Sequence, residues 1–474
     1  MSLFTSLRST AGALAAFDQA LSVTQDNVAN ASTPGYAKQR VSLEALQYGG
    51  VRAGPLMSAR DQYADQAIRQ RVATWGYSQQ QTDSLSALQG VFDISGNSGI
   101  PNALNNLFQS FTTWSQDVQD GQSRQSVLDR AGGVATAFQQ TALSLSSSAH
   151  DTEMQLQQTV AKVNDLVGQL QAANKQLAQG FELKDNPGLS SQVSSLEEQL
   201  SEYIDFSAQT QSDGTVMILM NGQTPLLIGQ RQYDLSFRMD QPSTPAPTFT
   251  DAPPRAFLTA SDGTDITAAS TGGRLGALLD VRNRLLPSYI GDAYQAGSLN
   301  QMAKQFADRV NTVLESGQIS SGATPQPGVA LFQYDTTNDA RVAQTLSVAT
   351  GMTASQLAPI DPGPPAVSNG IPLALAALGN PTQDADRIDS LSYNAFFGQM
   401  AANAGSALNS AQTEAQTDQS LVVQARTLRQ QTSGVSLDEE AALLIQFQRA
   451  YEANSRLITV LDSLTQDTIQ MLQP

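Results

Sequence analysis

The sequence predicts a mainly α-helical protein with a small inserted β domain and with long, coiled-coil-like helices at its two ends that pack together. Three observations carry this prediction. Apolar residues recur every seven residues near both termini, helical apolar spacing fills most of the chain between them, and near Tyr203 the spacing changes to that of β-strands. A chain of 474 residues is also too long for one compact core. We therefore expect an elongated, multidomain molecule that contains a helical bundle.

The N-terminal segment carries an apolar stripe with the spacing of a helix in a coiled coil. Apolar residues recur at intervals of seven, with two large side chains at the offset positions. The stripe consists of Leu3, Leu7, Leu14, Phe17, Leu21 and Val28. Ordering a helix costs roughly 1–2 kcal/mol of backbone entropy per residue, whereas burying each large side chain returns about 1.5–3 kcal/mol. The helix therefore needs a partner, in the same subunit or the next.

A turn ends this helix. In Thr33-Pro34-Gly35-Tyr36, proline at the second position fixes φ and glycine at the third accepts a positive φ, which is the pattern of a type II turn. Asn30 stands three residues before the turn begins. From the residues alone, a simple helix terminator is the plainer interpretation of this motif.

The middle of the chain divides by its hydrophobic period. Helical spacing predominates up to about residue 202, with a Ser-rich junction between two helices expected at His150. From Tyr203 short alternating runs are separated by Asp213-Gly214 and Asn221-Gly222, which are typical of tight hairpin turns. The predicted parts are terminal helices at 1–59 and 433–474, a helical bundle at 60–202, 261–316 and 390–432, an inserted β domain at 203–260, and a loop-rich variable segment at 317–389.

The C-terminal segment repeats the pattern of the first helix. Ser436 and Glu439 have the spacing of a capping box, so the helix is expected to start there, directly after Gly434. Its apolar residues again recur at intervals of seven with offset positions between them. The predicted assembly residues of this helix are Leu437, Leu444, Phe447, Tyr451, Ile458, Leu461 and Leu464. Since each terminal helix needs a partner, the simplest partner is the other one, in the same subunit or the next.

Composition excludes several functions. A net charge of -17 and a pI of about 4.4 argue against nucleic-acid binding, which needs clustered Lys and Arg. No run is long and apolar enough for a transmembrane span, and the N-terminus lacks the pattern of a cleavable signal, so a cytoplasmic location is the first expectation. His150 is the single histidine and there are no cysteines, so we expect no zinc site, no His-based catalysis, no cofactor and no enzymatic activity.

Two motifs resemble those of a known family. The turn from Ala29 to Tyr36, placed between heptad helices at both ends, is similar to that of the axial proteins of the bacterial flagellum. The opening of the last helix, Ser433 to Glu440, resembles more closely the hook-associated protein 1 family, which joins hook to filament. The order of parts also agrees over most of the chain. The segment 317–389 is shorter than the outer insertion that members of the family often carry.

The resemblance implies a function and a location. Terminal helices in that family pack with neighbouring copies into the core of a tube, and the protein leaves the cell through the flagellar type III export apparatus without a cleavable signal. This would reverse the cytoplasmic expectation and place the protein outside the cell, in the flagellum. The implied partners are copies of the chain itself, the hook protein, a second junction protein, filament subunits, and an export chaperone that binds the C-terminal helix. Neither nucleic acid nor membrane insertion is expected.

Other functional classes stay open at this point. A hook or rod subunit would share the paired terminal helices and the turn. A coiled-coil scaffold unrelated to flagella would explain the heptads but not the motifs at both ends. The sequence therefore predicts a structural subunit of the hook–filament junction that assembles through its terminal helices, with these two classes as alternatives.

Overall fold

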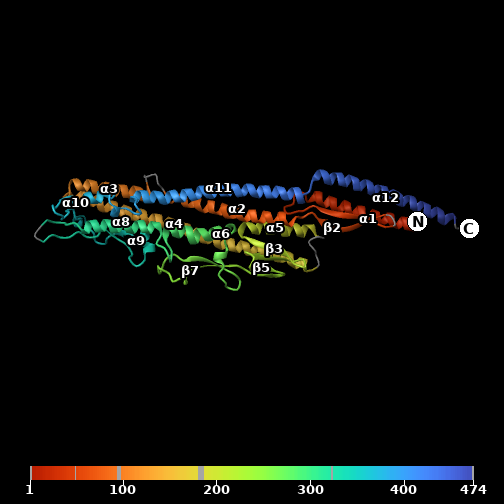
Figure 1. Cartoon of the computed structure of the whole chain (residues 1–474), viewed down its shortest axis with the longest axis horizontal. Coiled ribbons are helices and arrows are strands. Elements are labelled where there is room, and N and C mark those ends of the chain that lie inside the picture. The colour runs from red at the N-terminus through yellow and green to blue at the C-terminus, as the bar shows by residue number, and fades with distance from the viewer. Residues whose placement is uncertain (1–2, 48–49, 93–97, 180–185, 322–323, 472–474) are drawn as a thin grey trace. The chain divides into compact units, whose positions relative to one another are not determined.

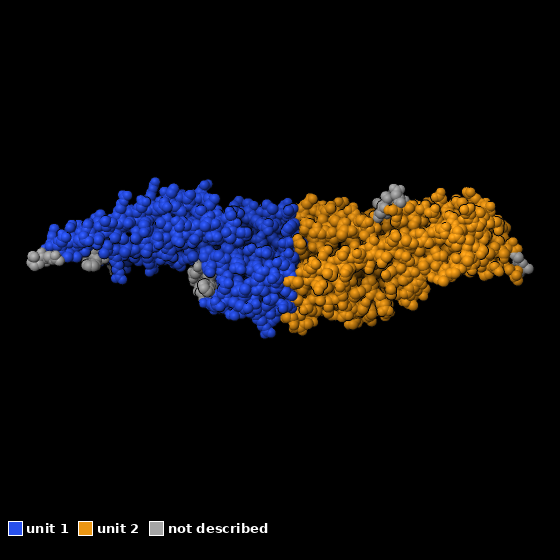
Figure 2. Space-filling model, turned by 180° about the vertical axis from the view of Figure 1, so that it is seen from behind, with its two compact units in different colours: residues 1–76, 162–234, 417–474 blue, residues 77–161, 235–416 orange. Residues whose placement is uncertain are grey.

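The structure, a computed structural model, describes residues 3–47, 50–92, 98–179, 186–321 and 324–471. It is mainly helical with small antiparallel sheets, which confirms the predicted fold class. Two compact units make up the chain, and each is assembled from separate stretches of sequence (Figure 2). Unit 1 comprises residues 1–76, 162–234 and 417–474, and unit 2 comprises residues 77–161 and 235–416.

Unit 1 contains both ends of the chain. Figure 1 shows α1 and α12 side by side, with the β1–β2 hairpin next to α1. The elements of this unit are α1 (Leu3–Ala29), β1 (Gln39–Ala45), β2 (Val51–Ser58), the start of α2 (Gln62–Gln89), the end of α4 (Gly121–Leu177), α5 (Pro187–Tyr203), β3 (Phe206–Thr210), β4 (Val216–Met220), β5 (Thr224–Ile228), β6 (Arg231–Gln232), the end of α11 (Tyr393–Ser433) and α12 (Leu437–Met471).

Strands β3 to β6 form an antiparallel four-stranded sheet in sequence order. The β4–β5 turn is made by Asn221 and Gly222, both with positive φ, which confirms the predicted hairpin turn. Asn174 of α4 fastens this sheet to the helix. Its Nδ2 donates to Val216 O at 2.7 Å and to Gly229 O at 2.6 Å, while its Oδ1 accepts from Val216 N at 2.8 Å.

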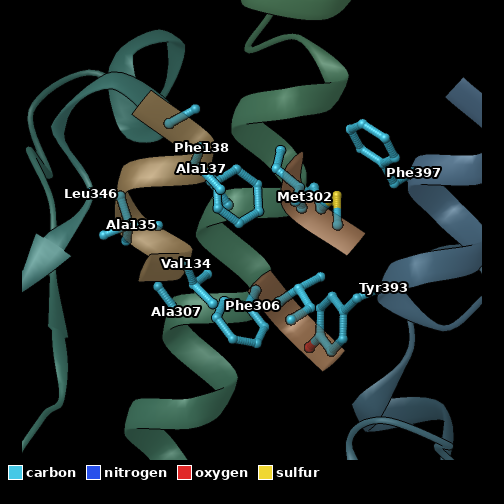
Figure 3. Close-up of a cluster of buried hydrophobic side chains, with 14 of the residues drawn as sticks. Val134, Ala135, Ala137, Phe138, Met302, Phe306, Ala307, Leu346, Tyr393 and Phe397 are labelled. Carbon is cyan, nitrogen blue, oxygen red and sulfur yellow. The ribbon is translucent and has the colours of Figure 1, made fainter. Parts of the chain in front are cut away.

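Unit 2 holds a large apolar core. Phe306 is its centre, with ring centroids 5.3 Å from Tyr393 and 5.5 Å from Phe332, and Figure 3 shows Val134, Phe138, Met302 and Phe397 around it. The elements are the end of α2, α3 (Gly99–Gln116), most of α4, β7 (Ser236–Asp240), β8 (Arg255–Thr259), α6 (Gly273–Asp280), a π-helical turn (Val281–Leu285), α7 (Leu286–Ile290), α8 (Ser298–Glu315), β9 (Phe332–Gln333), α9 (Val342–Thr345), β10 (Ser347–Val348), α10 (Gly370–Ala377) and most of α11.

The structure departs from the sequence prediction near His150. Residues 121–177 form one continuous helix, α4, so the predicted junction between two helices is wrong. Serine is a weak helix former because its hydroxyl competes for backbone groups, but here Ser148 Oγ donates to Ser144 O within the helix at 3.1 Å. Buried Leu145 and Ala149 keep the apolar face intact through this stretch.

In the structure, the strands of the predicted β segment are divided between the two units, and the predicted loop-rich segment contributes to a core. Strands from 203–260 fall into both units, because the β7–β8 hairpin is held within unit 2 by Asn283 of the π-helical turn. Asn283 Oδ1 accepts from Ala256 N at 2.8 Å and its Nδ2 donates to Ala256 O at 2.9 Å. The segment 317–389 consists of short elements and loops, yet it packs into the core of unit 2 through Leu331, Phe332, Leu346, Leu357, Ile371 and Leu375. The predicted domain boundaries remain a prediction.

Candidate assembly site at the two ends of the chain

The terminal helices α1 and α12 pack against each other in an antiparallel pair. Phe17 and Phe447 have ring centroids 6.4 Å apart, and ten residues further along α1, Asn27 contacts Glu440, which lies earlier in α12. Small residues at the centre of α1's buried face, Ala13, Ala16 and Ala20, let the helices approach closely. The partner that each terminal helix needs is therefore present within the same chain.

The predicted residues of α1 border this seam rather than form its centre. Leu7, Leu14, Phe17 and Leu21 are half-buried, whereas Val28 is exposed. The fully buried line consists of Ala13, Ala16, Ala20, Thr24 and Asn27. Leu3 begins the helix, but its side chain lies outside the described part of the structure.

The predicted residues of α12 divide between two faces. Leu444, Phe447, Tyr451, Ile458 and Leu461 are half-buried, at intervals of three, four and seven residues that place them on one side of the helix, as in a coiled-coil seam. Leu437 and Leu464 are 56% and 47% exposed. Leu464 belongs to a second stripe with Leu457, Val460 and Met471, which we call the outer stripe and which is exposed along its length.

The turn after α1 has the conformation that its residues require. Gly35 has φ +75°, and a Cβ at this position would lie 2.7 Å from Ser191 O of α5. Tyr36 N donates to Thr33 O at 3.1 Å and Thr33 N donates to Asn30 O at 2.9 Å, so successive turns bring the chain round after the helix. Pro34 is exposed on this turn. The turn is thus docked tightly on α5.

The two sequence motifs meet in a buried group of side chains, which we call the polar cluster: Asn27, Tyr36, Lys38, Gln39 and Glu440. Asn27 Nδ2 donates to Gln39 O at 2.8 Å and to Glu440 Oε2 at 3.0 Å, and its Oδ1 accepts from Gln39 N and from the Tyr36 hydroxyl, both at 2.9 Å. Lys38 Nζ lies 2.7 Å from Glu440 Oε1, with both side chains at most 5% exposed. The turn motif and the start of α12 are therefore joined directly.

Charge is balanced in the polar cluster. Burial alone would lower the pKa of the Lys38 ammonium, but its contacts with Glu440 and Glu439 outweigh burial and hold that pKa above its usual value. Burial, with the nearby Asp26 and Glu440 carboxylates, raises the pKa of Tyr36 to about 12. Lys38 is therefore charged and Tyr36 neutral at physiological pH.

The break between α11 and α12 is anchored to the segment after the turn. Ser433 O accepts from Lys38 N at 2.8 Å, and Ser433 Oγ accepts from Asp61 N at 3.1 Å. Half of the predicted capping box is present, since Ser436 Oγ accepts from Glu439 N at 3.4 Å. The Glu439 carboxylate turns instead to Lys38 Nζ at 3.0 Å, because the buried ammonium attracts it more strongly than the helix start does.

Sequence reasoning did not single out Asn27, Lys38, Gln39 or Glu440. A signal was present for Glu440 alone, because it lies seven residues before Phe447, at an offset position of the predicted seam where an apolar residue would be expected. In the described part of the chain, no group of His, Asp and Glu side chains is arranged to hold a metal ion, and none of the helices has the length and apolarity needed to cross a bilayer.

Comparisons with known proteins identify these terminal segments. Residues 7–36, which cover α1 and the turn, match the family model for flagella basal body rod proteins. Residues 429–471, which cover α12, match the model for the C-terminal part of flagellar basal body rod FlgEFG proteins. The packed terminal helices and the turn thus define a structural subunit of the bacterial flagellum.

The region between them assigns the subunit to one family within that class. Residues 85–332, just over half of the chain, match the model of the flagellar hook-associated protein FlgK helical domain, and the chain belongs to this family. It is 29% identical to flagellar hook-associated protein 1 of Bacillus subtilis (strain 168), over 99% of this chain and 98% of that protein. Family membership confirms the predicted class and disfavours a rod or hook subunit.

A solved structure shares the fold. The flagellar hook junction protein FlgK from Burkholderia pseudomallei superimposes with a TM-score of 0.64 at 15% identity, covering 78% of this chain and all of that one. The protein is thus a structural component of the flagellum, where it assembles with other flagellar components.

Proposed function

We propose that this subunit forms part of the junction between hook and filament, and that it assembles with copies of itself through α1 and α12. The observation that carries this proposal is the outer stripe of α12. A helix with one apolar face normally buries that face alone, but α12 has a second row of apolar side chains, Leu457, Val460, Leu464 and Met471, that unit 1 leaves exposed. This row fits a helix of a neighbouring copy.

A groove beside the seam supports the same proposal. Ala20 and Val23 of α1, Val41 of β1, and Leu443 and Phe447 of α12 line it within unit 1. The apolar surface of this groove gives a neighbouring helix a second place to pack. Burial of such surface stabilises by roughly 25 cal/mol per Å².

We infer the finer partners from the family. The hook protein is expected on one side of the layer, and a second junction protein with the filament subunits on the other. An export chaperone is expected to bind α12 before assembly, and the chain is expected to leave the cell through the type III export apparatus without a cleavable signal. The proposed role is structural, with no catalytic step and no cofactor.

Charge substitutions on the outer stripe test the proposal. In L457D/L464D each carboxylate would have to be desolvated on binding, which costs several kcal/mol per ion in a packed interface. Since both side chains are exposed in the monomer, its Tm should stay unchanged. We expect the variant to appear in the culture medium, while the cells bear no filaments and do not swim.

The matched control is T459D/Q466D. These residues are also exposed, are also seven residues apart and carry the same added charge, but they lie on another face of α12. Cells with this control should swim normally. Normal filaments on cells carrying L457D/L464D would show that the outer stripe has no part in assembly.

A further inference from the structure

The seam between α1 and α12 is apolar and repetitive over most of its length. Half-buried side chains on α12 follow at alternating intervals of four and three, namely Leu444, Phe447, Tyr451, Asn454, Ile458, Leu461 and Thr465. Because this pattern repeats every seven residues, sliding α12 along α1 by one heptad brings seam positions opposite seam positions again. Apolar packing alone therefore does not select one register.

Two buried polar residues interrupt the pattern at matching places. Asn27 follows Ala20 by seven residues, and Glu440 precedes Phe447 by seven, so both occupy seam positions. Each is 1% exposed, and Asn27 Nδ2 donates to Glu440 Oε2 at 3.0 Å. Lys38 Nζ, 2.7 Å from the other carboxylate oxygen, supplies the counter-charge. These three groups meet in the observed register.

A shift by one heptad would separate them. Glu440 would move away from Lys38 and Asn27, and the Lys38 ammonium, 5% exposed, would lose its buried partner. Separating a buried ion pair is strongly unfavourable, and one polar contact in a coiled-coil seam can fix the register for this reason. We propose that the contact of Asn27 and Lys38 with Glu440 sets the register in which α12 pairs with α1, and so fixes where along α1 the outer stripe lies.

Disulfide crosslinking tests this proposal on the whole monomer, independently of any assembly. The chain has no cysteine, so any intramolecular disulfide must join the two cysteines that are introduced. F17C/F447C joins positions whose rings lie 6.4 Å apart in the observed register, and F17C/N454C joins positions brought together by a shift of seven residues. With the native polar residues, we expect only the first pair to form a disulfide under mild oxidation.

The decisive variant is K38M/E440L, which replaces the buried ion pair by apolar side chains of similar size. We expect the F17C/N454C crosslink to appear in this background beside F17C/F447C, because the seam then also accepts the shifted register. In E440Q the amide oxygen still accepts from Asn27, so F17C/F447C should remain the main crosslink. K38M/E440M, which also removes both charges of the ion pair, carries the same test with the same expectation should K38M/E440L not fold.

Two results would overturn the proposal. If K38M/E440L crosslinks only through F17C/F447C, the apolar seam selects the register without the polar contact. If neither pair crosslinks while circular dichroism shows native helix content, the contact holds α12 on α1 rather than choosing its register. Failure of the assembly experiment with L457D/L464D would leave this inference intact, since crosslinking is measured in the monomer.

Discussion

The side chain of Asn27 makes four hydrogen bonds at the end of α1, which is all that an amide can make. Its partners belong to the turn, to β1 and to α12. A hydrogen bond to a charged group contributes about 1.5–3 kcal/mol and a neutral one about 0.5–1.5 kcal/mol. A single residue therefore connects three segments, and its replacement affects all of them together.

Adding one methyl group at Gly35 tests how closely the turn after α1 packs against α5. In G35A the Cβ would meet Ser191 O at 2.7 Å and the positive φ would be strained. We expect a loss of about 1–3 kcal/mol in the free energy of unfolding, measured by denaturant titration.

The control for this prediction is G222A. Gly222 has φ +71°, close to the +75° of Gly35, but nothing lies within 4 Å of the place that its new methyl group would take. It should therefore show the backbone strain without the clash. Equal losses of unfolding free energy in G35A and G222A would mean that the close approach of the new methyl group to Ser191 of α5 does not destabilise the fold.

Alkaline pH should weaken the polar cluster. The pKa of Tyr36 is raised from 10.0 to about 12 by burial and nearby carboxylates, and the pKa of Lys38 is raised above 10.5 by its carboxylate partners despite burial. Both groups are protonated in the folded state at pH values where the unfolded chain begins to lose the proton. Their stabilisation is complete below about pH 10 and is lost as pH rises through the folded pKa values.

The measurement is the Tm as a function of pH, with thermal unfolding monitored by circular dichroism. Native protein should show a decline that starts near pH 10, and Y36F should decline less steeply because one of the two groups is gone. Y63F is the control, since Tyr63 is 82% exposed. An identical pH profile for the native protein and Y36F would contradict the assignment of the Tyr36 shift.

At the scale of elements, the heptad periods predicted that α1 and α12 exist and pair, but they did not separate the seam of α12 from its outer stripe. Leu444 and Leu464 both lie in a heptad-rich helix, yet only the first faces α1. An α-helix advances 100° per residue, so stripes offset by one position point in different directions. The position of α1 decides which of the two stripes is covered, and the periodicity of the α12 sequence does not specify that position.

Polar residues account for the other differences. Glu440 looks like an interruption of the predicted seam, and Asn27 like an ordinary polar residue beside it, until they are seen to contact each other. Asn283 looks like an ordinary helical residue, although it hydrogen-bonds to the backbone of β8 and holds the β7–β8 hairpin. In each case the partner is distant in sequence or lies on another kind of element, so local patterns give no indication of it.

At the scale of the whole molecule, α12 is a long helix with very little buried surface. Glu440 is the only buried residue in the described part of α12. The apolar side chains of this helix are half-buried or exposed. In unit 2, by contrast, one continuous core includes Trp114, Phe138, Phe306 and Tyr393. The free energy of local opening should therefore be much lower for α12 than for the core of unit 2.

Limited proteolysis of the dilute monomer tests this difference. We expect the first cuts within α12 and at the break around Gly434, then within the first 30 to 60 residues, because α1 loses its partner once α12 is removed. The middle of the chain should survive as a resistant fragment, identified by mass spectrometry. K38M/E440L still pairs α12 with α1 and T459D/Q466D leaves the seam untouched, so both variants should lose α12 at about the native rate. Equal resistance of α12 and unit 2 in the native monomer would show that the contacts with α1 stabilise α12 far more than its exposed surface suggests.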